Sequence, residues 1–195
     1  MAERIAWGPQ HGPQASLVRC PVEEIFYGGA RGGGKTDGML GKFGIKAARH
    51  GKGVRGIFFR REYPQLDAAI DRSREIYAPL GAEFSAMRKM WTFPNGATLR
   101  FRSLERDADA EKYQGHSYTD VFFEELGNYP SPDPVMKLKA TLRSAEGVPC
   151  QFHATGNPGG PGHNWVKARY VDPAPQGWEI IEHQNTKRVF IPAKV

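Results

Sequence analysis

A glycine-rich segment near the N-terminus constrains the fold of this chain more than any other feature. Residues 28–36 read GGARGGGKT and follow a short apolar run, residues 24–27. The phosphate-loop pattern G-x-x-x-x-G-K-[ST] is met by Gly29, Gly34, Lys35 and Thr36. In proteins such a loop joins a strand to a helix, and its backbone N–H groups surround a phosphate. The segment therefore predicts an α/β fold that binds a nucleoside triphosphate, rather than a flexible glycine linker.

Each residue type in this loop has its own chemical task. Glycine allows the backbone angles that turn successive N–H groups toward one phosphate, and the following helix adds its positive end. Lys35 is expected to reach the β- and γ-phosphates, and the Thr36 hydroxyl to complete the shell of a bound Mg²⁺. The glycines expected to lie against the phosphates are Gly29, Gly32, Gly33 and Gly34.

Composition narrows the class of protein further. A length of 195 residues suits one domain, residues 1–195, with a substantial core. Two cysteines without a paired metal-ligand motif argue against a disulfide framework or a zinc site, and favour a reducing, intracellular setting. No apolar run approaches membrane-spanning length, so we expect no membrane partner. The formal net charge of +6 is compatible with a polyanionic partner, and equally with solubility alone.

Strand and helix patterns alternate along the rest of the chain. We expect an irregular N-terminal arm over residues 1–20 and a core over residues 21–195. The expected strands lie at 23–28, 54–59, 119–124, 149–155 and 188–193, and the expected helices at 36–50, 65–77 and 134–145. An Asn-Gly pair between residues 91–93 and 98–101 predicts an inserted β-hairpin. This alternation predicts a mostly parallel sheet flanked by helices, with ligands at the carboxyl ends of its strands.

Three glycines recur at every third position of the helix expected over residues 36–50. Gly38, Gly41 and Gly44 each cost about 1 kcal/mol of helix propensity relative to alanine. Since glycine permits close approach, the spacing favours tight packing of this helix on a sheet over simple tolerance.

Two adjacent acids end the strand expected over residues 119–124. Glu124 and Glu125 follow the apolar run Val121-Phe122-Phe123. An acid beside a phosphate loop can orient Mg²⁺ and its waters, and a second acid can polarise the attacking water as a general base. We assign Glu124 to the metal together with Thr36, and Glu125 to the water. A solvated acidic turn is the alternative, and the phosphate loop upstream argues against it.

Polar residues also end the next strand along the chain. Thr155 and Asn157 precede a loop rich in Gly and Pro, residues 158–163. Side chains at this place can sense a γ-phosphate or an attacking water, and the loop can relay that state. An ordinary Gly/Pro loop is the alternative that the residues alone leave open.

Taken in order, these pieces resemble the ATPase domain of large terminase subunits, the motors that package DNA into phage capsids. The resemblance covers nearly the whole chain and rests on three segments, residues 27–36 (YGGARGGGKT), 112–126 (KYQGHSYTDVFFEEL) and 155–165 (TGNPGGPGHNW). The first is shared by many ATPases, and the other two are more specific. The resemblance implies a P-loop NTPase fold of the additional-strand catalytic glutamate type, with ATP and Mg²⁺ as cofactors.

The resemblance also implies roles for particular residues. Gln14 resembles the glutamine that reads adenine in this family, with Gln10 as the competitor. Arg31 resembles an arginine thought to respond to the γ-phosphate, which makes it a catalytic candidate beside Lys35 and Glu125. Thr155 and Asn157 match the motif that couples hydrolysis to movement. An arginine finger from a neighbouring subunit would be Arg102 or Arg106, unless these charges are solvated or face DNA.

The implied partners are double-stranded DNA, the portal protein, the small terminase subunit and further copies of the chain in a ring on the portal. The implied location is the host cytoplasm during virion assembly. Two departures from the family pattern stand out. Glu124 replaces the common Asp, and the C-terminal nuclease domain of the family is missing from residues 1–195. We therefore expect no DNA cleavage by this chain.

Two other functions fit a phosphate loop. A phosphotransferase would need a lid and an acceptor pocket, and would not need the acid pair Glu124-Glu125. A non-catalytic assembly module would bind nucleotide only to stabilise its fold. Intact Lys35, Thr36 and Glu125 argue against the second alternative.

Overall fold

One mixed sheet forms the centre of the molecule. The computed structural model describes residues 7–30 and 32–193. Its strands are ordered β3-β4-β5-β2-β6-β7-β1-β9-β8, and every neighbouring pair from β5 to β9 is parallel. The strands are β1 (Glu24–Gly29), β2 (Arg55–Arg60), β3 (Glu83–Ser85), β4 (Met90–Thr92), β5 (Thr98–Ser103), β6 (Asp120–Phe123), β7 (Gln151–Gly156), β8 (Ile180–His183) and β9 (Thr186–Ala193). The predicted α/β fold with a mostly parallel sheet is confirmed.

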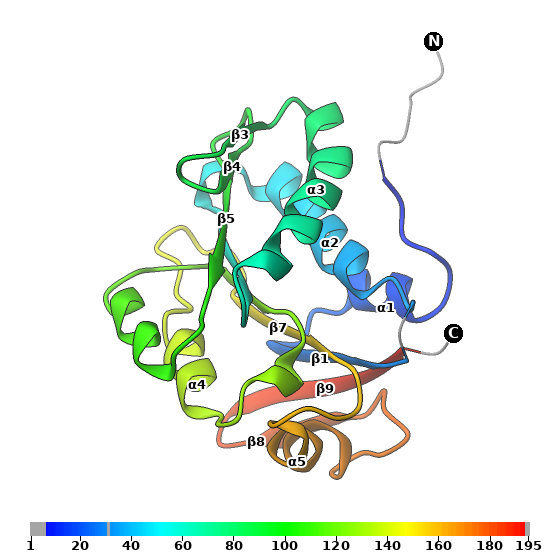
Figure 1. The fold of residues 1–195 in the computed structure, drawn as a ribbon. Coiled ribbons are helices and arrows are strands. Elements are labelled where there is room, and N and C mark those ends of the chain that lie inside the picture. Colours follow the sequence, from blue (N-terminus) through cyan, green and yellow to red (C-terminus); the bar gives the residue numbers. More distant parts are fainter. Residues whose placement is uncertain (1–6, 31, 194–195) are drawn as a thin grey trace.

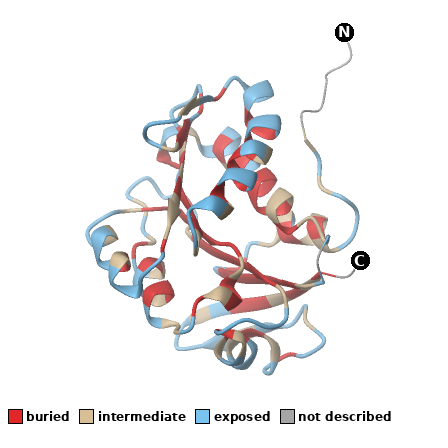
Figure 2. Cartoon of the chain, viewed as in Figure 1, coloured by how far each residue is buried: buried red, intermediate tan, exposed pale blue. Residues whose placement is uncertain are grey.

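Helices cover both faces of the sheet, as Figure 1 shows. They are α1 (Pro13–Arg19), α2 (Lys35–His50), α3 (Pro64–Tyr77), α4 (Asp133–Lys139) and α5 (His163–Val166), the last continued by a π-helical turn, Lys167–Val171. The first three share one apolar core with Phe58 and Phe122. The other two share a second core with Phe59 and Phe123. Since side chains alternate across a strand, each apolar strand supplies both cores, and Figure 2 shows the sheet buried between them. No described helix is long and apolar enough to cross a membrane.

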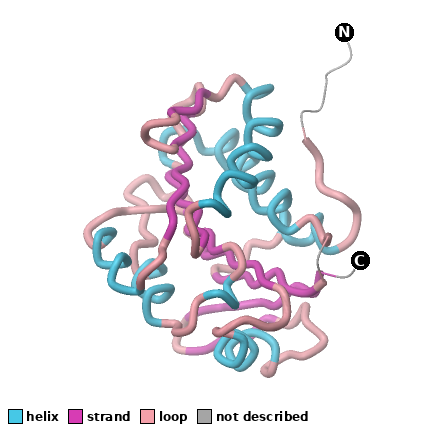
Figure 3. Tube along the Cα trace, in the orientation of Figure 1, coloured by secondary structure: helices cyan, strands magenta, loops and turns pink. Residues whose placement is uncertain are grey.

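The secondary structure differs from the prediction in several places (Figure 3). The arm is not irregular throughout, because Pro13–Arg19 form a helix whose first turn contains a proline, a favoured residue there. The helix expected over 134–145 ends at Lys139. The hairpin of β4 and β5 is present, and β3 and β8 add antiparallel edge strands that the sequence did not reveal. Both extra strands are short or largely exposed, so their apolar pattern is weak.

The glycines of α2 face helices and the N-terminal arm, and not a sheet. A Cβ at Gly41 would lie 2.2 Å from the Trp7 ring, and one at Gly38 would lie 2.8 Å from Leu17. A Cβ at Gly44 would lie 3.3 Å from the ring of Tyr77 at the end of α3. The prediction of close packing is therefore right, but the predicted partner is wrong.

Candidate functional site

The phosphate loop joins β1 to α2 at the carboxyl edge of the parallel strands. Gly29, Gly32 and Gly34 have φ of 139°, 83° and 60°, values that other residues rarely adopt. A Cβ at Gly29 would lie only 2.4 Å from the Ala193 carbonyl oxygen, so β9 also requires glycine there. The Tyr27 hydroxyl donates a hydrogen bond of 2.8 Å to the Gly33 carbonyl oxygen. Strand and loop together therefore fix the backbone that the sequence pattern predicts.

Lys35 lies at the first position of α2, close to the two predicted acids. Its ammonium group donates a hydrogen bond of 2.6 Å to the Ala30 carbonyl oxygen. Burial lowers the pKa of Lys35, and the negative charges of Glu125 and Glu124 partly offset that effect. The structure therefore places Lys35 close enough to Glu124 and Glu125 for their charges to interact.

Glu124 is buried and links the phosphate loop to the neighbouring strand β2. The Thr36 hydroxyl donates a hydrogen bond to its Oε1. Arg60, the last residue of β2, forms an ion pair with Glu124, with Nε 2.5 Å from Oε2. The carboxylate is only 2% exposed, so these two partners offset the free energy of burying its charge.

This donor set fits Mg²⁺. A hydroxyl and a carboxylate in contact supply the hard oxygen ligands that Mg²⁺ prefers. Among the described residues no group of three or more His, Cys, Asp or Glu side chains could hold a metal ion. Mg²⁺ commonly uses one or two protein ligands with substrate phosphates and waters, so a site of this size is sufficient.

Glu125 is held by both polar residues that follow the next strand. Its backbone is left-handed, with φ of 56°, a conformation uncommon for a residue other than glycine. Asn157 Nδ2 lies 3.1 Å from Oε1 and 3.1 Å from Oε2 of Glu125. The Glu125 N–H donates a hydrogen bond of 3.4 Å to Thr155 Oγ1. The second and third sequence motifs therefore meet at one carboxylate.

The turn after Glu125 packs directly against the loop after Asn157. A Cβ at Gly127 would lie 2.7 Å from the Gly159 carbonyl oxygen, and one at Gly160 would lie 2.6 Å from that of Gly127. The Gly162 N–H donates a hydrogen bond of 2.8 Å to the Gly127 carbonyl oxygen. Because the two backbones touch, the Glu125 turn and the loop over 156–162 form one packed unit.

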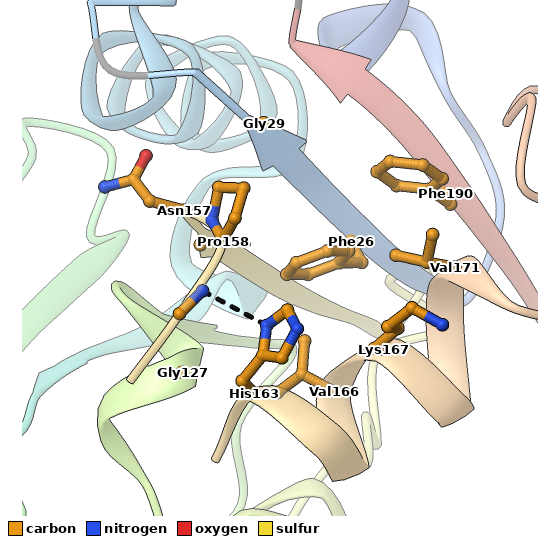
Figure 4. Close-up of a pocket in the computed structure, with 12 residues that line it drawn as sticks. Phe26, Gly29, Gly127, Asn157, Pro158, His163, Val166, Lys167, Val171 and Phe190 are labelled. Atoms are coloured by element: carbon orange, nitrogen blue, oxygen red, sulfur yellow. Dashed lines mark hydrogen bonds between the residues drawn. The ribbon is translucent and has the colours of Figure 1, made fainter. Parts of the chain in front are cut away.

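An apolar cavity of about 220 Å³ lies behind this unit (Figure 4). Its walls include Gly29 of the phosphate loop, Phe26 and Phe190 of neighbouring strands, Val166 of α5 and Val171 of the π-helical turn. Asn157, whose amide contacts Glu125, and Pro158 also line it. The loop over 156–162 therefore borders an apolar cavity on this side, through Asn157, Pro158 and Gly159.

The remaining predicted residues lie in different surroundings. Gln14 is buried beside the phosphate loop, where Nε2 donates a hydrogen bond of 2.8 Å to the Gly34 carbonyl oxygen and Oε1 accepts one of 2.5 Å from the Gln10 N–H. Arg31 lies outside the described residues. Arg102 donates hydrogen bonds to backbone carbonyl oxygens of Arg88 and Phe101, whereas Arg106 has an 80% exposed side chain.

Arg60 is the site residue that sequence reasoning missed. In the sequence Arg60 stands beside a second arginine, Arg61, and no local pattern distinguishes the two. The available signal was topological: β2 runs parallel to β6, with Phe59 paired to Phe123. The residues that follow these two in the chain, Arg60 and Glu124, must therefore lie side by side.

The site combines a strand, a phosphate loop, a helix and an acid pair on a parallel sheet. Together these features define a P-loop NTPase fold. A sequence model of the family described as terminase large subunit, T4likevirus-type, N-terminal, matches residues 26–149. The chain therefore belongs to this terminase family. A search of curated proteins gave no match.

Solved structures show the same fold at low sequence identity. The large terminase ATPase domain of Thermus phage P74-26 has a TM-score of 0.70 and 14% identity, covering 96% of this chain and 81% of that one. The large terminase of a thermophilic bacteriophage has a TM-score of 0.68 and 17% identity, covering 91% and 44%. The N-terminal domain of the DNA packaging ATPase of bacteriophage phi29 has a TM-score of 0.63 and 15% identity, covering 92% and 95%. The chain thus spans less than half of the large terminase of the thermophilic bacteriophage.

Proposed function

We propose that this chain is a Mg²⁺-dependent ATPase domain that drives the packaging of double-stranded DNA into a phage procapsid. One observation carries the proposal: Glu125 is clamped by Asn157 beside Lys35 and the phosphate loop. A carboxylate fixed at this place can orient water for in-line attack on a γ-phosphate. Membership in the terminase family supplies the biological setting.

In this proposal the chain's residues divide the work by their place in the fold. Lys35 binds the β- and γ-phosphates, and Glu125 accepts the proton of the attacking water. Thr36 and Glu124 would hold Mg²⁺, which would neutralise charge on the phosphates. Thr155 and Asn157 pass the state of Glu125 to the loop over 156–162. The residues assigned to the nucleotide are Gln14, Gly29, Arg31, Gly32, Gly33, Gly34, Lys35, Thr36, Thr155 and Asn157, with Gln14 at the adenine and Arg31 also catalytic.

Names of similar structures support the cofactor and the partner. The large terminase of the thermophilic bacteriophage has been solved in complex with ADP and with ATP-gamma-S. The phi29 relative is named a DNA packaging ATPase. We propose the same ligand and process here, with a homo-oligomeric ring, the portal protein and the small terminase subunit as partners in the host cytoplasm. Arg106 is the better placed of the two candidate fingers, since its side chain is 80% exposed.

Phosphate release from ATP, measured without any acceptor, tests this function. We expect turnover with Mg²⁺, none with EDTA, and a more than linear rise with protein concentration if subunits complete each other's sites. Lys35→Ala is expected to abolish turnover. Phosphate transfer only when an acceptor is added would instead identify a phosphotransferase. Nucleotide stabilisation without turnover would identify a non-catalytic module.

A further inference from the structure

A basic groove lies at the end of the sheet remote from the nucleotide site. It has a volume of about 460 Å³, and its walls are Arg55, Gly56, Met90, Thr98, Arg100 and the loop over 115–118. Arg55 begins β2 and Arg60, which contacts Glu124, ends it. At about 3.3 Å per residue the groove is roughly 16 Å from the acid pair. It is therefore separate from the nucleotide site.

Strand register places arginines of β2 and β5 on one face of the sheet, and two of them, Arg55 and Arg100, line the groove. Arg55 pairs with Thr98, and Arg100 and Arg102 follow on the same face of β5, because side chains alternate. Arg55 bonds Thr119 through its backbone alone. Within the described residues, no ion pair or side-chain hydrogen bond engages the guanidinium groups of Arg55 and Arg100. No acidic side chain lines the groove.

The acidic residue nearest in sequence to the groove loop forms its ion pairs with residues outside the groove. Asp120, two residues after Tyr118, is buried and pairs with Lys46 and His153. These partners belong to α2 and β7, so its charge is already balanced. The guanidinium groups in the groove therefore have no internal counter-ion among the residues that the structure describes.

The loop that lines the groove belongs to the second sequence motif, residues 112–126, and to a part of it that does not contribute to the nucleotide site. Residues 112–118 lie at the start of β6, whereas the acid pair lies at its end. Arg143 holds the loop, with Nε 2.5 Å from Ser117 Oγ and Nη2 2.7 Å from the Gly115 carbonyl oxygen. His116 stacks on Tyr118 with ring centroids 5.9 Å apart. The loop is thus a fixed wall that presents His116 and Ser117 beside the arginines.

We propose that this groove binds the phosphate backbone of duplex DNA, an assignment that rests on the proposed packaging function. Arginine forks match phosphate oxygens, and hydroxyl and ring N–H groups add contacts that carry no sequence preference. An acidic protein segment is the competing anion. Protein interfaces are anchored by apolar or aromatic side chains, and the large exposed ones of the described residues lie outside the groove: Ile45, Tyr63, Leu80, Met87, Trp178 and Ile180. Phosphate is therefore the better fit.

A pair of charge-matched double variants tests the groove. Arg55→Gln with Arg100→Gln removes the groove charges. Arg49→Gln with Lys52→Gln removes two exposed charges, one in the last turn of α2 and one in the turn that follows it. Binding of a fluorescent DNA duplex is measured by anisotropy over a salt series. Each phosphate contact contributes about 0.9 to the slope of log affinity against log salt. We expect the groove variant to lose about 1.8 of this slope and about 10- to 100-fold in affinity at low salt, and the control to lose little.

Several results would overturn the assignment. These are a wild type that does not bind the duplex, equal losses in both variants, and a groove variant with unchanged DNA affinity but altered self-association in sedimentation. ATP turnover without DNA, measured on the same samples, separates this proposal from the proposed function. If the wild type hydrolyses ATP but does not bind the duplex, the groove assignment is rejected and the ATPase assignment stands. If DNA binding is lost only in the groove variant and no sample hydrolyses ATP, the ATPase assignment is rejected and the groove assignment stands.

Discussion

Arg60 Nε lies 2.5 Å from Glu124 Oε2, while the Thr36 hydroxyl donates to the other oxygen of the same carboxylate. The pair joins the end of β2 to the phosphate loop through one buried acid. Glutamate has one more rotatable bond than aspartate, so its carboxylate needs more support to stay in place. The Arg60 ion pair supplies that support.

Arg60→Gln is therefore expected to raise the Mg²⁺ concentration needed for nucleotide binding by about tenfold, equivalent to about 1.4 kcal/mol. Titration of Mg²⁺ against a fluorescent ATP analogue measures this. Arg60→Lys keeps the charge and should lose less. Nucleotide affinity in EDTA should be the same in all three proteins, and an equal loss in EDTA would show that Arg60 supports the fold and not the metal site.

Asn157→Ala should lower turnover through Glu125. Its amide contacts both oxygens of the Glu125 carboxylate, and without it the carboxylate gains rotational freedom. We expect kcat to fall by about 10²-fold, within the range for a general base, and ATP affinity to fall much less, because Asn157 is only one of many groups assigned to the nucleotide. Asn164→Ala, at an exposed position of α5, is the matched control. A loss of affinity without a loss of kcat would contradict the role of Asn157.

Gly162→Ala should disrupt the unit formed by the Glu125 turn and the loop after Asn157. A Cβ at Gly162 would lie 2.1 Å from the Tyr129 carbonyl oxygen, so the backbones must separate. Overpacking of this kind costs about 1–3 kcal/mol. Urea denaturation should report that loss, together with reduced turnover. Gly8→Ala, where a Cβ would meet nothing within 4 Å, should leave both unchanged.

We expect Glu24 to make the free energy of unfolding depend on pH in the acid range. Burial alone would raise its pKa, but hydrogen bonds and charge from Arg169 and Lys139 lower it to about 2, against 4.5 for the free side chain. A depressed pKa means that the unfolded chain binds the proton first. This stabilisation is therefore complete above pH 4.5 and is lost as the pH falls toward 2, by on the order of 3 kcal/mol.

Urea denaturation of the wild type and Glu24→Gln at several pH values measures this contribution. The difference in unfolding free energy between the two proteins should be largest near pH 7 and should shrink between pH 4.5 and 2. A difference that does not change with pH would refute the assignment to the Glu24 carboxylate. Both proteins carry the other titrating acids, so those acids cancel.

Much of the candidate site was predictable because local patterns determine it. The phosphate loop needs its glycines at fixed spacing, and the acid pair follows an apolar strand, so both are visible in the sequence. The Asn-Gly turn likewise predicted the hairpin of β4 and β5. In each case the residues that define the feature are neighbours in the chain.

Features that depend on distant pairings were not predictable. Arg60 acquires its role from the parallel register of β2 and β6, which no short pattern encodes. The glycines of α2 pack on Trp7, Leu17 and Tyr77, and only the tertiary structure selects these partners over a sheet. The early end of α4 at Lys139 reflects a chain that turns back, with Tyr118 bridged to Leu142.

The central claim is that Glu125 acts as the base of an ATPase, and Glu125→Gln tests it most directly. The substitution keeps the size of the side chain and removes its ability to accept a proton. We predict that phosphate release falls by at least about 10²-fold while Mg·ATP still raises the melting temperature as in the wild type. Unchanged phosphate release in Glu125→Gln, from a protein that binds ATP normally, would contradict the account.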